Sequence, residues 1–266
     1  MKPYQRLGIM AALPQELAML LSLIENNLEK QTIAKRDYYT GQIHGVDCVI
    51  VLARVGKVAA AASTATMINV FKIDALVFTG TAGALNAQLG IGDVVIATSL
   101  SQHDMDASPF FPRYEIPLLG LSQFQSNQTL SQALDQAAHT YIEQHMARDL
   151  DAGSLSAYCQ HQPKVWHGQI LSGDRFIQQG QSFDRVHAAW PEALCVEMEG
   201  AAVAQVCYEY GLPFAVLRVI SDLADGQAHI DFDGFLNSVA KFMGAGILQQ
   251  FLQHQVQVPN TTTVGD

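Results

Sequence analysis

The chain has 266 residues, of which 49% are hydrophobic and 15% charged, a composition typical of a compact globular protein and not of a disordered one. Fifteen Lys and Arg against 25 Asp and Glu give a net charge of −10, which argues against nucleic acid or an anionic membrane surface as a partner. No apolar run approaches the roughly 20 residues of a membrane-spanning helix, and the N-terminus lacks the apolar region of a signal peptide.

The first predicted strand is Leu7–Leu13, and Pro14 begins a helix directly after it. Glu16 therefore lies just past the C-terminal end of a strand, at the mouth of a helix. Open α/β sheets bind ligands at that edge. The alternative is that Glu16 only complements the helix dipole.

A hairpin is predicted from Tyr39–Gly45 and Val46–Ala53, followed by an Ala-rich helix over Val58–Phe71. Ala75–Gly80 is predicted as a buried strand that ends in a glycine turn, and Thr81–Ala84 as its continuation. Small residues at this turn let a ligand approach the backbone closely. The spacing matches neither a P-loop nor a dinucleotide-binding fingerprint.

Asp93–Thr98 is a further predicted strand, and the metal-like sequence His103-Asp104-Met105-Asp106 follows it. Because no second His or Cys cluster lies nearby in sequence, we predict no metal site there. The Pro-punctuated aromatic stretch Phe110–Pro117 is predicted either to pack as a loop or to close a pocket beside the glycine turn.

Strands and helices alternate through most of the chain, which favours a single α/β domain with helices on both faces of a sheet. We place this domain at residues 1–254 and a polar tail at 255–266. The remaining predicted elements are a helix over Asn127–Leu150, a polar loop over Asp151–Pro163, a strand over Trp166–Ser172, a helix over Gly200–Tyr210, a strand over Phe214–Ile220 and a long amphipathic helix over Phe232–Gln253.

Two apolar segments near the C-terminus end in carboxylates. Glu197 and Glu199 close the first, and Asp222 closes the second, which also contains Arg218. Buried acids are costly unless they are paired, hydrogen-bonded or in use. These residues predict a polar pocket cut into the core, where carboxylate pKa values are tuned for proton transfer.

The cysteines are Cys48, Cys159, Cys195 and Cys207, and none belongs to a CxxC pair. We predict reduced thiols in mainly apolar surroundings and no metal centre. Free thiols favour a cytoplasmic location.

Several short blocks occur in a characteristic order and together resemble the nucleoside phosphorylase/hydrolase superfamily, most closely its 5′-methylthioadenosine/S-adenosylhomocysteine nucleosidase family. The blocks are Gly8–Glu16, Gly56–Ala61, Thr79–Gly83, Ser172–Asp174, Val196–Glu199 and Ser221–Asp222. The resemblance implies a mixed central β-sheet, usually a homodimer, and no metal or cofactor. It also implies a small-molecule adenine nucleoside as substrate, hydrolysed between adenine N9 and ribose C1′.

The resemblance assigns the chemistry to two acids. Glycosidic cleavage passes through an oxocarbenium-like sugar and a purine leaving group that needs a proton. Asp222 is expected beside adenine N7 as the acid, positioned by Ser221. Glu16 is expected to orient or deprotonate the water, within a polar shell completed by Arg218 and Thr81.

The same resemblance assigns the substrate contacts. Glu199 is expected to hold the ribose hydroxyls and Met198 to lie against the sugar, while Glu197 faces the ribose or nearby polar groups. The further positions are Phe176 stacked on adenine, the Ile177 backbone at its Watson–Crick edge, Phe232 as a wall of the 5′-alkylthio pocket, and Ala107 and Phe110 lent by a neighbouring subunit.

Alternatives remain at this point. A purine nucleoside phosphorylase shares the scaffold, but it needs Arg side chains around phosphate where this chain has Glu16. A nucleosidase for another 6-aminopurine nucleoside would share the acids. A non-catalytic adenosine-binding module would need Phe176 and Glu199 but not both acids. Thr81 and Leu13 replace the usual Ser and Met, and the loop Phe110–Leu119 and the insertion Ala152–Lys164 leave the 5′-substituent preference open.

Overall fold

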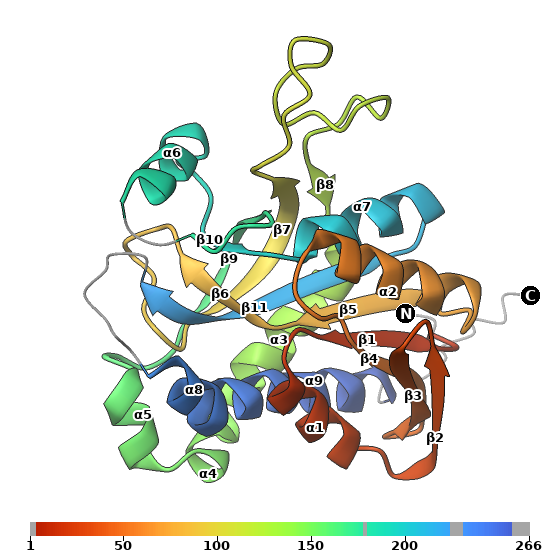
Figure 1. Cartoon of the computed structure of the whole chain (residues 1–266). Helices are drawn as coiled ribbons and strands as arrows, with labels where there is room; N and C mark the ends of the chain where they lie inside the picture. The colour runs from red at the N-terminus through yellow and green to blue at the C-terminus, as the bar shows by residue number, and fades with distance from the viewer. Residues whose placement is uncertain (1–3, 178–179, 224–230, 257–266) are drawn as a thin grey trace, which may run out of the picture.

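The computed structural model describes residues 4–177, 180–223 and 231–256 (Figure 1). Within these ranges one mixed sheet runs through the molecule in the order β2-β3-β4-β1-β5-β11-β6-β10-β9-β7-β8. Its strands are β1 (Leu7–Ala11), β2 (Asn26–Ile33), β3 (Arg36–Ile43), β4 (Val46–Leu52), β5 (Ala75–Thr79), β6 (Thr81–Ala84), β7 (Val94–Gln102), β8 (Phe124–Gln125), β9 (Val165–Ser172), β10 (Cys195–Glu197) and β11 (Phe214–Leu223).

The sheet has an open half and a half that closes on itself. In the open half, β1 pairs in parallel with β4 and β5, and β5 pairs in parallel with β11. In the other half β11 also pairs antiparallel with β7, so that β11, β6, β10, β9 and β7 form a closed ring of strands. The carboxyl ends of β1 and β11 point toward the same side, which is where a ligand site is expected in such sheets.

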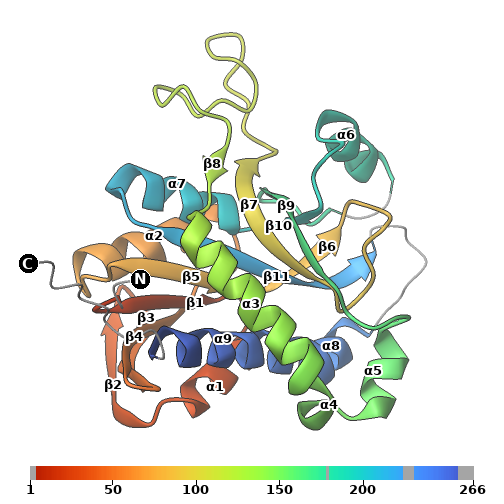
Figure 2. The ribbon, with the colours of Figure 1, turned by 180° about the vertical axis from the view of Figure 1, so that it is seen from behind.

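Helices cover both faces of the sheet (Figures 1 and 2). Residues of α1, α3 and α9 pack into one apolar cluster, and residues of α2 and α7 pack into another on the opposite face. The helices are α1 (Pro14–Ser22), α2 (Lys57–Asn69), α3 (Gln128–Gln144), α4 (Met146–Asp149), α5 (Ala152–Tyr158), α6 (Gln181–Ala189), α7 (Gly200–Tyr210), α8 (Phe232–Phe235), the π-helical turn η1 (Leu236–Ala240) and α9 (Lys241–Val256). The predicted fold class, a single α/β domain with a mixed sheet, is therefore confirmed.

Most predicted elements are present, and the differences have local causes. The expected loop over Asp151–Pro163 is wrong, because Asp151 accepts a hydrogen bond from the Ser154 amide and starts α5. Strand β2 escaped prediction because nearly all its side chains are exposed and lack apolar alternation. Thr81–Ala84 forms the separate strand β6, which leaves β5 at Gly80 to pair with β11 and β10.

The long C-terminal helix is present but is interrupted by η1. Helix α9 extends through Val256, and the rest of the predicted tail, residues 257–266, lies outside the described residues. All four cysteines are free thiols, and Cys48, Cys195 and Cys207 are buried. In the described part of the chain no helix is long and apolar enough to cross a membrane.

Candidate active site

A cavity of about 200 Å³ opens where β6, β10 and β11 meet the loop after β1. Its walls come from segments far apart in the sequence, as the fold predicts for the edge of a parallel region. The lining residues are Ala12, Leu13, Val55, Thr81, Ala82, Gly83, Arg175, Phe176, Ile177, Val196, Glu197, Met198, Glu199, Ser221, Asp222 and Phe232.

The Glu16 carboxylate lies behind the wall of this cavity that Ala12 and Leu13 form. One oxygen, Oε2, accepts hydrogen bonds of 3.2 Å from each of the Ala12 and Leu13 amides. The other, Oε1, has no hydrogen-bond partner among the described residues, and the side chain is almost wholly buried. Burial raises the pKa of Glu16 to about 7, against the opposing effects of Arg218 and the two amides. Near neutral pH this carboxyl is therefore poised between its two protonation states.

Asp222 reaches the cavity because β11 bulges beside it. The pairing between β11 and β6 shifts between Ile220 and Asp222, so Ser221 is the extra residue of a β-bulge. Bulges of this kind redirect the next side chain. A Cβ at Gly83 would lie 2.8 Å from Asp222 Oδ1, so a larger residue there would displace the carboxyl from its present position.

The proton affinity of Asp222 is raised in this position. Burial raises the pKa of the Asp222 carboxyl, and a hydrogen bond of 2.9 Å from Ser221 Oγ to Oδ2 opposes the rise. An acid that must hold a proton near neutral pH needs a shift in this direction.

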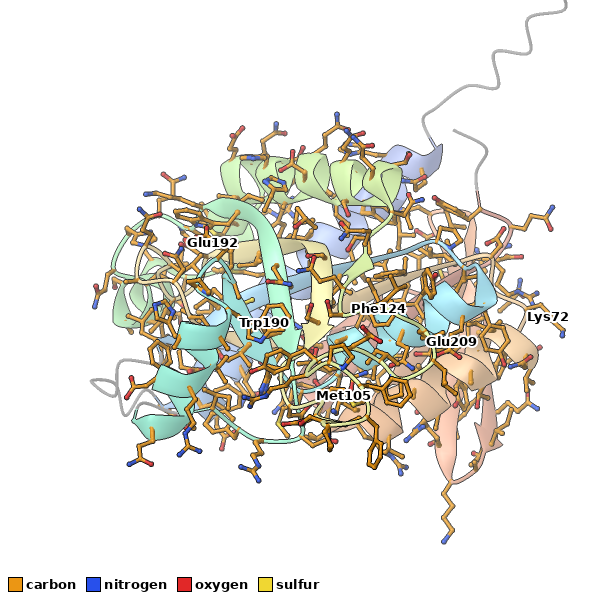
Figure 3. The ribbon with its side chains drawn as sticks, turned by 90° about the horizontal axis from the view of Figure 1, so that it is seen from above. Lys72, Met105, Phe124, Trp190, Glu192 and Glu209 are labelled. Carbon is orange, nitrogen blue, oxygen red and sulfur yellow. The ribbon has the colours of Figure 1, made fainter. Side chains whose placement is uncertain are left out.

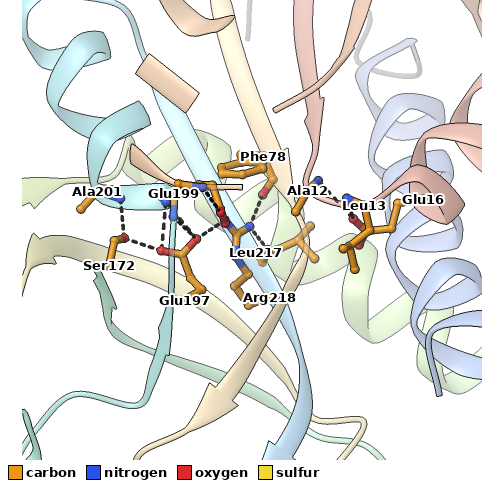
Figure 4. A network of polar contacts seen from close by, with 12 residues as sticks. Ala12, Leu13, Glu16, Phe78, Ser172, Glu197, Glu199, Ala201, Leu217 and Arg218 are labelled. Carbon is orange, nitrogen blue, oxygen red and sulfur yellow. Dashed lines mark hydrogen bonds and ion pairs between the residues drawn. The ribbon is translucent and has the colours of Figure 1, made fainter. Parts of the chain in front are cut away.

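The Glu197 carboxylate forms an ion pair and several hydrogen bonds with other groups of the protein (Figure 4). Its Oε2 binds Arg218 Nη2 at 2.7 Å, and its oxygens accept hydrogen bonds from Ser172 Oγ and from the Glu199 and Gly200 amides. The Arg218 guanidinium is wholly buried, lies 4.0 Å from the centre of the Phe78 ring and donates to the Leu217 carbonyl. Glu197 lines the cavity, but both of its oxygens already accept hydrogen bonds from protein groups.

This arrangement leaves Glu199 available. Glu199 is the N-cap residue of α7, yet its side chain does not cap the helix. The Glu197 carboxylate and Ser172 Oγ bind the first amides of α7 instead, those of Gly200 and Ala201. One Glu199 oxygen, Oε1, accepts a hydrogen bond of 2.8 Å from the Gly56 amide. Burial, reinforced by the charge of Glu197, raises the pKa of Glu199 to about 7.

Apolar side chains line the rest of the cavity. Ile177 is buried, whereas the Phe176 and Phe232 rings are 62% and 40% exposed and stand at the mouth. Thr81 and Met198 complete the lining on the sides of β6 and β10. Aromatic walls with a few convergent polar groups are typical of small-molecule sites.

The structure gathers nine of the thirteen predicted site residues in the cavity walls: Thr81, Phe176, Ile177, Glu197, Met198, Glu199, Ser221, Asp222 and Phe232. Glu16 and Arg218 lie behind the walls, buried. Ala107 and Phe110 lie apart, in the loop between β7 and β8 that projects from the body, and Phe110 is 87% exposed. Figure 3 views the molecule from the side of this loop, with Met105 and Phe124 near its two ends.

Several contributors were not predicted as site residues. Ser172 and Gly56 lie in sequence blocks that carried the family resemblance, but nothing in their residue types indicated that one holds Glu197 and the other Glu199. The close approach of Gly83 to the Asp222 carboxyl follows from strand pairing, which sequence spacing does not give. In the sequence His103–Asp106, Asp104 pairs with Lys57 at 2.6 Å, and the described residues contain no group of His, Cys, Asp and Glu that could hold a metal ion.

Comparison with known proteins agrees with this geometry. The family model described as the phosphorylase superfamily matches residues 6–253. A 5′-methylthioadenosine/S-adenosylhomocysteine nucleosidase of Staphylococcus aureus (strain bovine RF122 / ET3-1) is 36% identical over 235 residues, which cover 88% of this chain and 93% of that protein.

Solved structures give the same result. The 5′-methylthioadenosine/S-adenosylhomocysteine nucleosidase from Neisseria meningitidis, in complex with methylthio-immucillin-A, matches with a TM-score of 0.81 and 31% identity over 94% of this chain and 99% of that chain. The nucleosidase of Streptococcus pneumoniae in complex with 8-aminoadenine matches with a TM-score of 0.78 and 32% identity over 93% and 99%. The similarity thus spans both halves of the sheet and all the residues that line the cavity.

Proposed function

Because the chain belongs to the 5′-methylthioadenosine/S-adenosylhomocysteine nucleosidase family of the phosphorylase superfamily, we infer that it hydrolyses the N-glycosidic bond of these adenine nucleosides. The products are adenine and a 5-alkylthioribose. The observation that carries the inference is the placement of Asp222 in the cavity and of Glu16 behind its wall, both with raised pKa values.

Asp222 is the general acid in this proposal. The purine is a poor leaving group as an anion, so a proton delivered to adenine N7 as the bond to C1′ breaks lowers the barrier. Burial keeps the proton on Asp222 at a pH where an ordinary Asp is ionised. The Ser221 hydroxyl fixes the carboxyl orientation from Oδ2.

Glu16 is the group that directs water at C1′. Its amide hydrogen bonds fix Oε2, and Oε1 carries no protein hydrogen bond among the described residues. As the sugar gains oxocarbenium character, a carboxylate at this wall stabilises the positive charge and accepts a proton from the attacking water. The buried Arg218 lowers the pKa of Glu16 and so favours the ionised form.

Substrate binding follows from the remaining walls. The Glu199 carboxyl and the Met198 side chain hold the ribose, Phe176 and Ile177 hold the adenine, and Phe232 contacts the 5′-alkylthio group. Thr81 completes the polar side near the sugar. The apolar lining of the cavity and its aromatic mouth suit a nucleoside with an apolar 5′ substituent.

We further propose a cytoplasmic homodimer. The loop between β7 and β8 projects from the body and exposes Phe110 and Leu118 by 87% and 91%. Two apolar side chains this exposed on one projecting loop favour coverage of that loop by a partner. In the homodimer Ala107 and Phe110 would complete the 5′ pocket of the other subunit. Four free thiols fit a reducing compartment, and the products fit nucleoside catabolism and methionine salvage.

The test separates hydrolysis from phosphorolysis. Arg175 is the only Lys or Arg among the described cavity-lining residues, and carboxylates repel a phosphate nucleophile. Purified protein is given 5′-methylthioadenosine with and without phosphate, and the sugar product is identified. A free 5-methylthioribose at equal rates supports the proposal, whereas a sugar 1-phosphate that requires phosphate overturns it. The same assay with adenosine tests for a nucleosidase of another 6-aminopurine nucleoside.

A further inference from the structure

We propose that helix α5 determines the 5′-substituent preference by holding the helical turn that carries Phe232, with Tyr158 as the positioning residue. This inference rests on the proposed function. Helix α5 lies within the segment Ala152–Lys164, which is predicted from the sequence to be an insertion, and beside α8 in both views of the ribbon (Figures 1 and 2). Phe232 is the first residue of α8 and a wall of the cavity.

Tyr158 contacts α8 at two places. Its ring meets the Phe235 ring edge-on, with centroids 5.7 Å apart and planes at 70°. Its hydroxyl oxygen occupies the space that a Cβ on Gly234 would need, so the phenol lies directly against the Gly234 backbone. Phe235 is wholly buried and belongs to the main apolar cluster. The Tyr158 side chain therefore lies in contact with the turn two to three residues after Phe232.

The rest of that turn is fixed from the other side. Asp231 caps α8, because its Oδ1 accepts a hydrogen bond of 2.9 Å from the Gly234 amide. Gly234 is thus enclosed between the Asp231 carboxylate and the Tyr158 phenol. The π-helical turn η1 follows directly, and α5 contacts it as well. Such π-helical segments occur frequently at functional sites.

The sequence of α5 places Tyr158 on the face of the helix that packs against the protein. The Asp151 side chain starts it, and Leu155 and Tyr158, three residues apart, share the face that packs on the main cluster. Neither residue lines the cavity. Their effect on the substrate must therefore pass through α8, which contributes Phe232 and no other residue to the described cavity lining. The adenine and ribose contacts come from other elements.

Because only the 5′ contact depends on α8, the preference between two substrates with different 5′ groups tests the proposal. Substituting Tyr158→Ala removes the support from Gly234 and Phe235, so the turn with Phe232 relaxes outward and the 5′ end of the cavity widens. A methylthio group then loses contact, whereas the larger homocysteine group of S-adenosylhomocysteine tolerates the change. We expect the ratio of kcat/KM for S-adenosylhomocysteine to that for 5′-methylthioadenosine to rise by about fivefold or more, through KM for the smaller substrate.

Three variants control the experiment. Tyr158→Phe keeps the ring against Phe235, and Ser156→Ala changes an exposed residue of α5; both are expected to keep the ratio within about twofold of wild type. If the alanine variant does not fold, the same ratio of kcat/KM is measured for Tyr158→Leu, which retains apolar packing. A merely structural role for Tyr158 would lower Tm but leave the ratio unchanged, and that result overturns the proposal.

A crystal structure of the Tyr158→Ala variant decides the matter independently of activity. Displacement of the Phe232 ring relative to wild type supports the inference, and an unmoved ring overturns it. If the wild-type protein releases adenine from neither substrate, the proposed function has failed, and the structure of the variant still tests the role of Tyr158.

Discussion

Arg218 and Glu197 form a buried ion pair, with 2.7 Å between Nη2 and Oε2, that lies between two other carboxyls with raised pKa values. The positive charge of Arg218 partly offsets the effect of burial on Glu16. The negative charge of Glu197 adds to the effect of burial on Glu199. The two charges of the ion pair thus shift the proton affinities of Glu16 and Glu199 in opposite directions.

Glu16→Gln is expected to lower turnover by at least about 100-fold, because the amide cannot accept a proton from the attacking water. Adenine release under single-turnover conditions measures the effect. Glu25→Gln, at an exposed acid outside the cavity lining, is the matched control and is expected to retain activity. Near-normal adenine release by the Glu16 variant would falsify the assigned role.

The same substitution is expected to change how stability depends on pH. The pKa of Glu16 is about 7 in the folded state against an ordinary 4.5, so the folded protein binds this proton more tightly than the unfolded chain. The stability it contributes is complete below pH 4.5 and is lost as pH rises to about 7. The loss is about 3 kcal/mol for a fully buried group.

Urea unfolding at pH 5 and pH 8 measures this difference. Wild type should lose more stability between the two values than Glu16→Gln does, although Glu199 adds its own pH dependence to both proteins. Equal losses in the two proteins would contradict the raised pKa of Glu16.

Asp222→Asn is expected to lower turnover by at least about 100-fold, because Asn cannot transfer a proton to the departing adenine. In wild type the rate should fall as pH rises through the raised pKa of Asp222. Ser221→Ala removes the hydrogen bond that lowers this pKa, so the falling limb should move to higher pH. A limb that stays in place in the Ser221 variant argues that another group is the acid.

The fold and much of the cavity could be predicted because buried strands, and glycines at the C-terminal ends of helices, leave strong local patterns in the sequence. The strand and helix on either side of Gly211 illustrate this, since Gly211 adopts a left-handed conformation with φ of 65° at the end of α7. Strand β2 left no such pattern, because its exposed polar side chains obey no alternation that a core imposes.

The roles within the carboxylate cluster could not be predicted from spacing. Glu197 and Glu199 are two residues apart at the end of the same apolar segment, and residue type does not distinguish them. Only the three-dimensional placement of Ser172, Arg218 and the first amides of α7 commits Glu197 to the protein and leaves Glu199 open to a ligand. In the same way, the bulge at Ser221 follows from strand pairing with β6 and not from composition.

Arg218→Met is expected to destabilise the protein by about 3–5 kcal/mol, because it leaves the buried Glu197 carboxylate without its counter-ion. The double variant Arg218→Met, Glu197→Gln should recover part of this loss, and urea unfolding of the four proteins gives the coupling. The recovery requires that the two side chains interact in the folded state. Additive losses would contradict the buried ion pair.

Ser172→Ala is expected to cost about 1–2 kcal/mol and to raise KM for the nucleoside more than it changes kcat. The hydroxyl donates to Glu197 and accepts from the Ala201 amide, so its loss loosens the turn that carries Glu199. Ser22→Ala, which removes an exposed hydroxyl bonded to the Met19 carbonyl, is the control. Equal KM values in wild type and Ser172→Ala would show that this turn holds Glu199 without the hydroxyl.

Phe110→Ser is expected to weaken the proposed homodimer and to raise KM for 5′-methylthioadenosine, because the exposed ring in the projecting loop is proposed to enter the partner's 5′ pocket. Sedimentation across a range of protein concentrations measures the assembly, and steady-state kinetics at the same concentrations measure KM. Leu28→Ser changes another exposed apolar side chain, 56% exposed on the far strand β2, and should leave both quantities unchanged. A wild-type protein that sediments as a monomer at assay concentration and retains full activity would rule out a contribution of Phe110 from a second subunit.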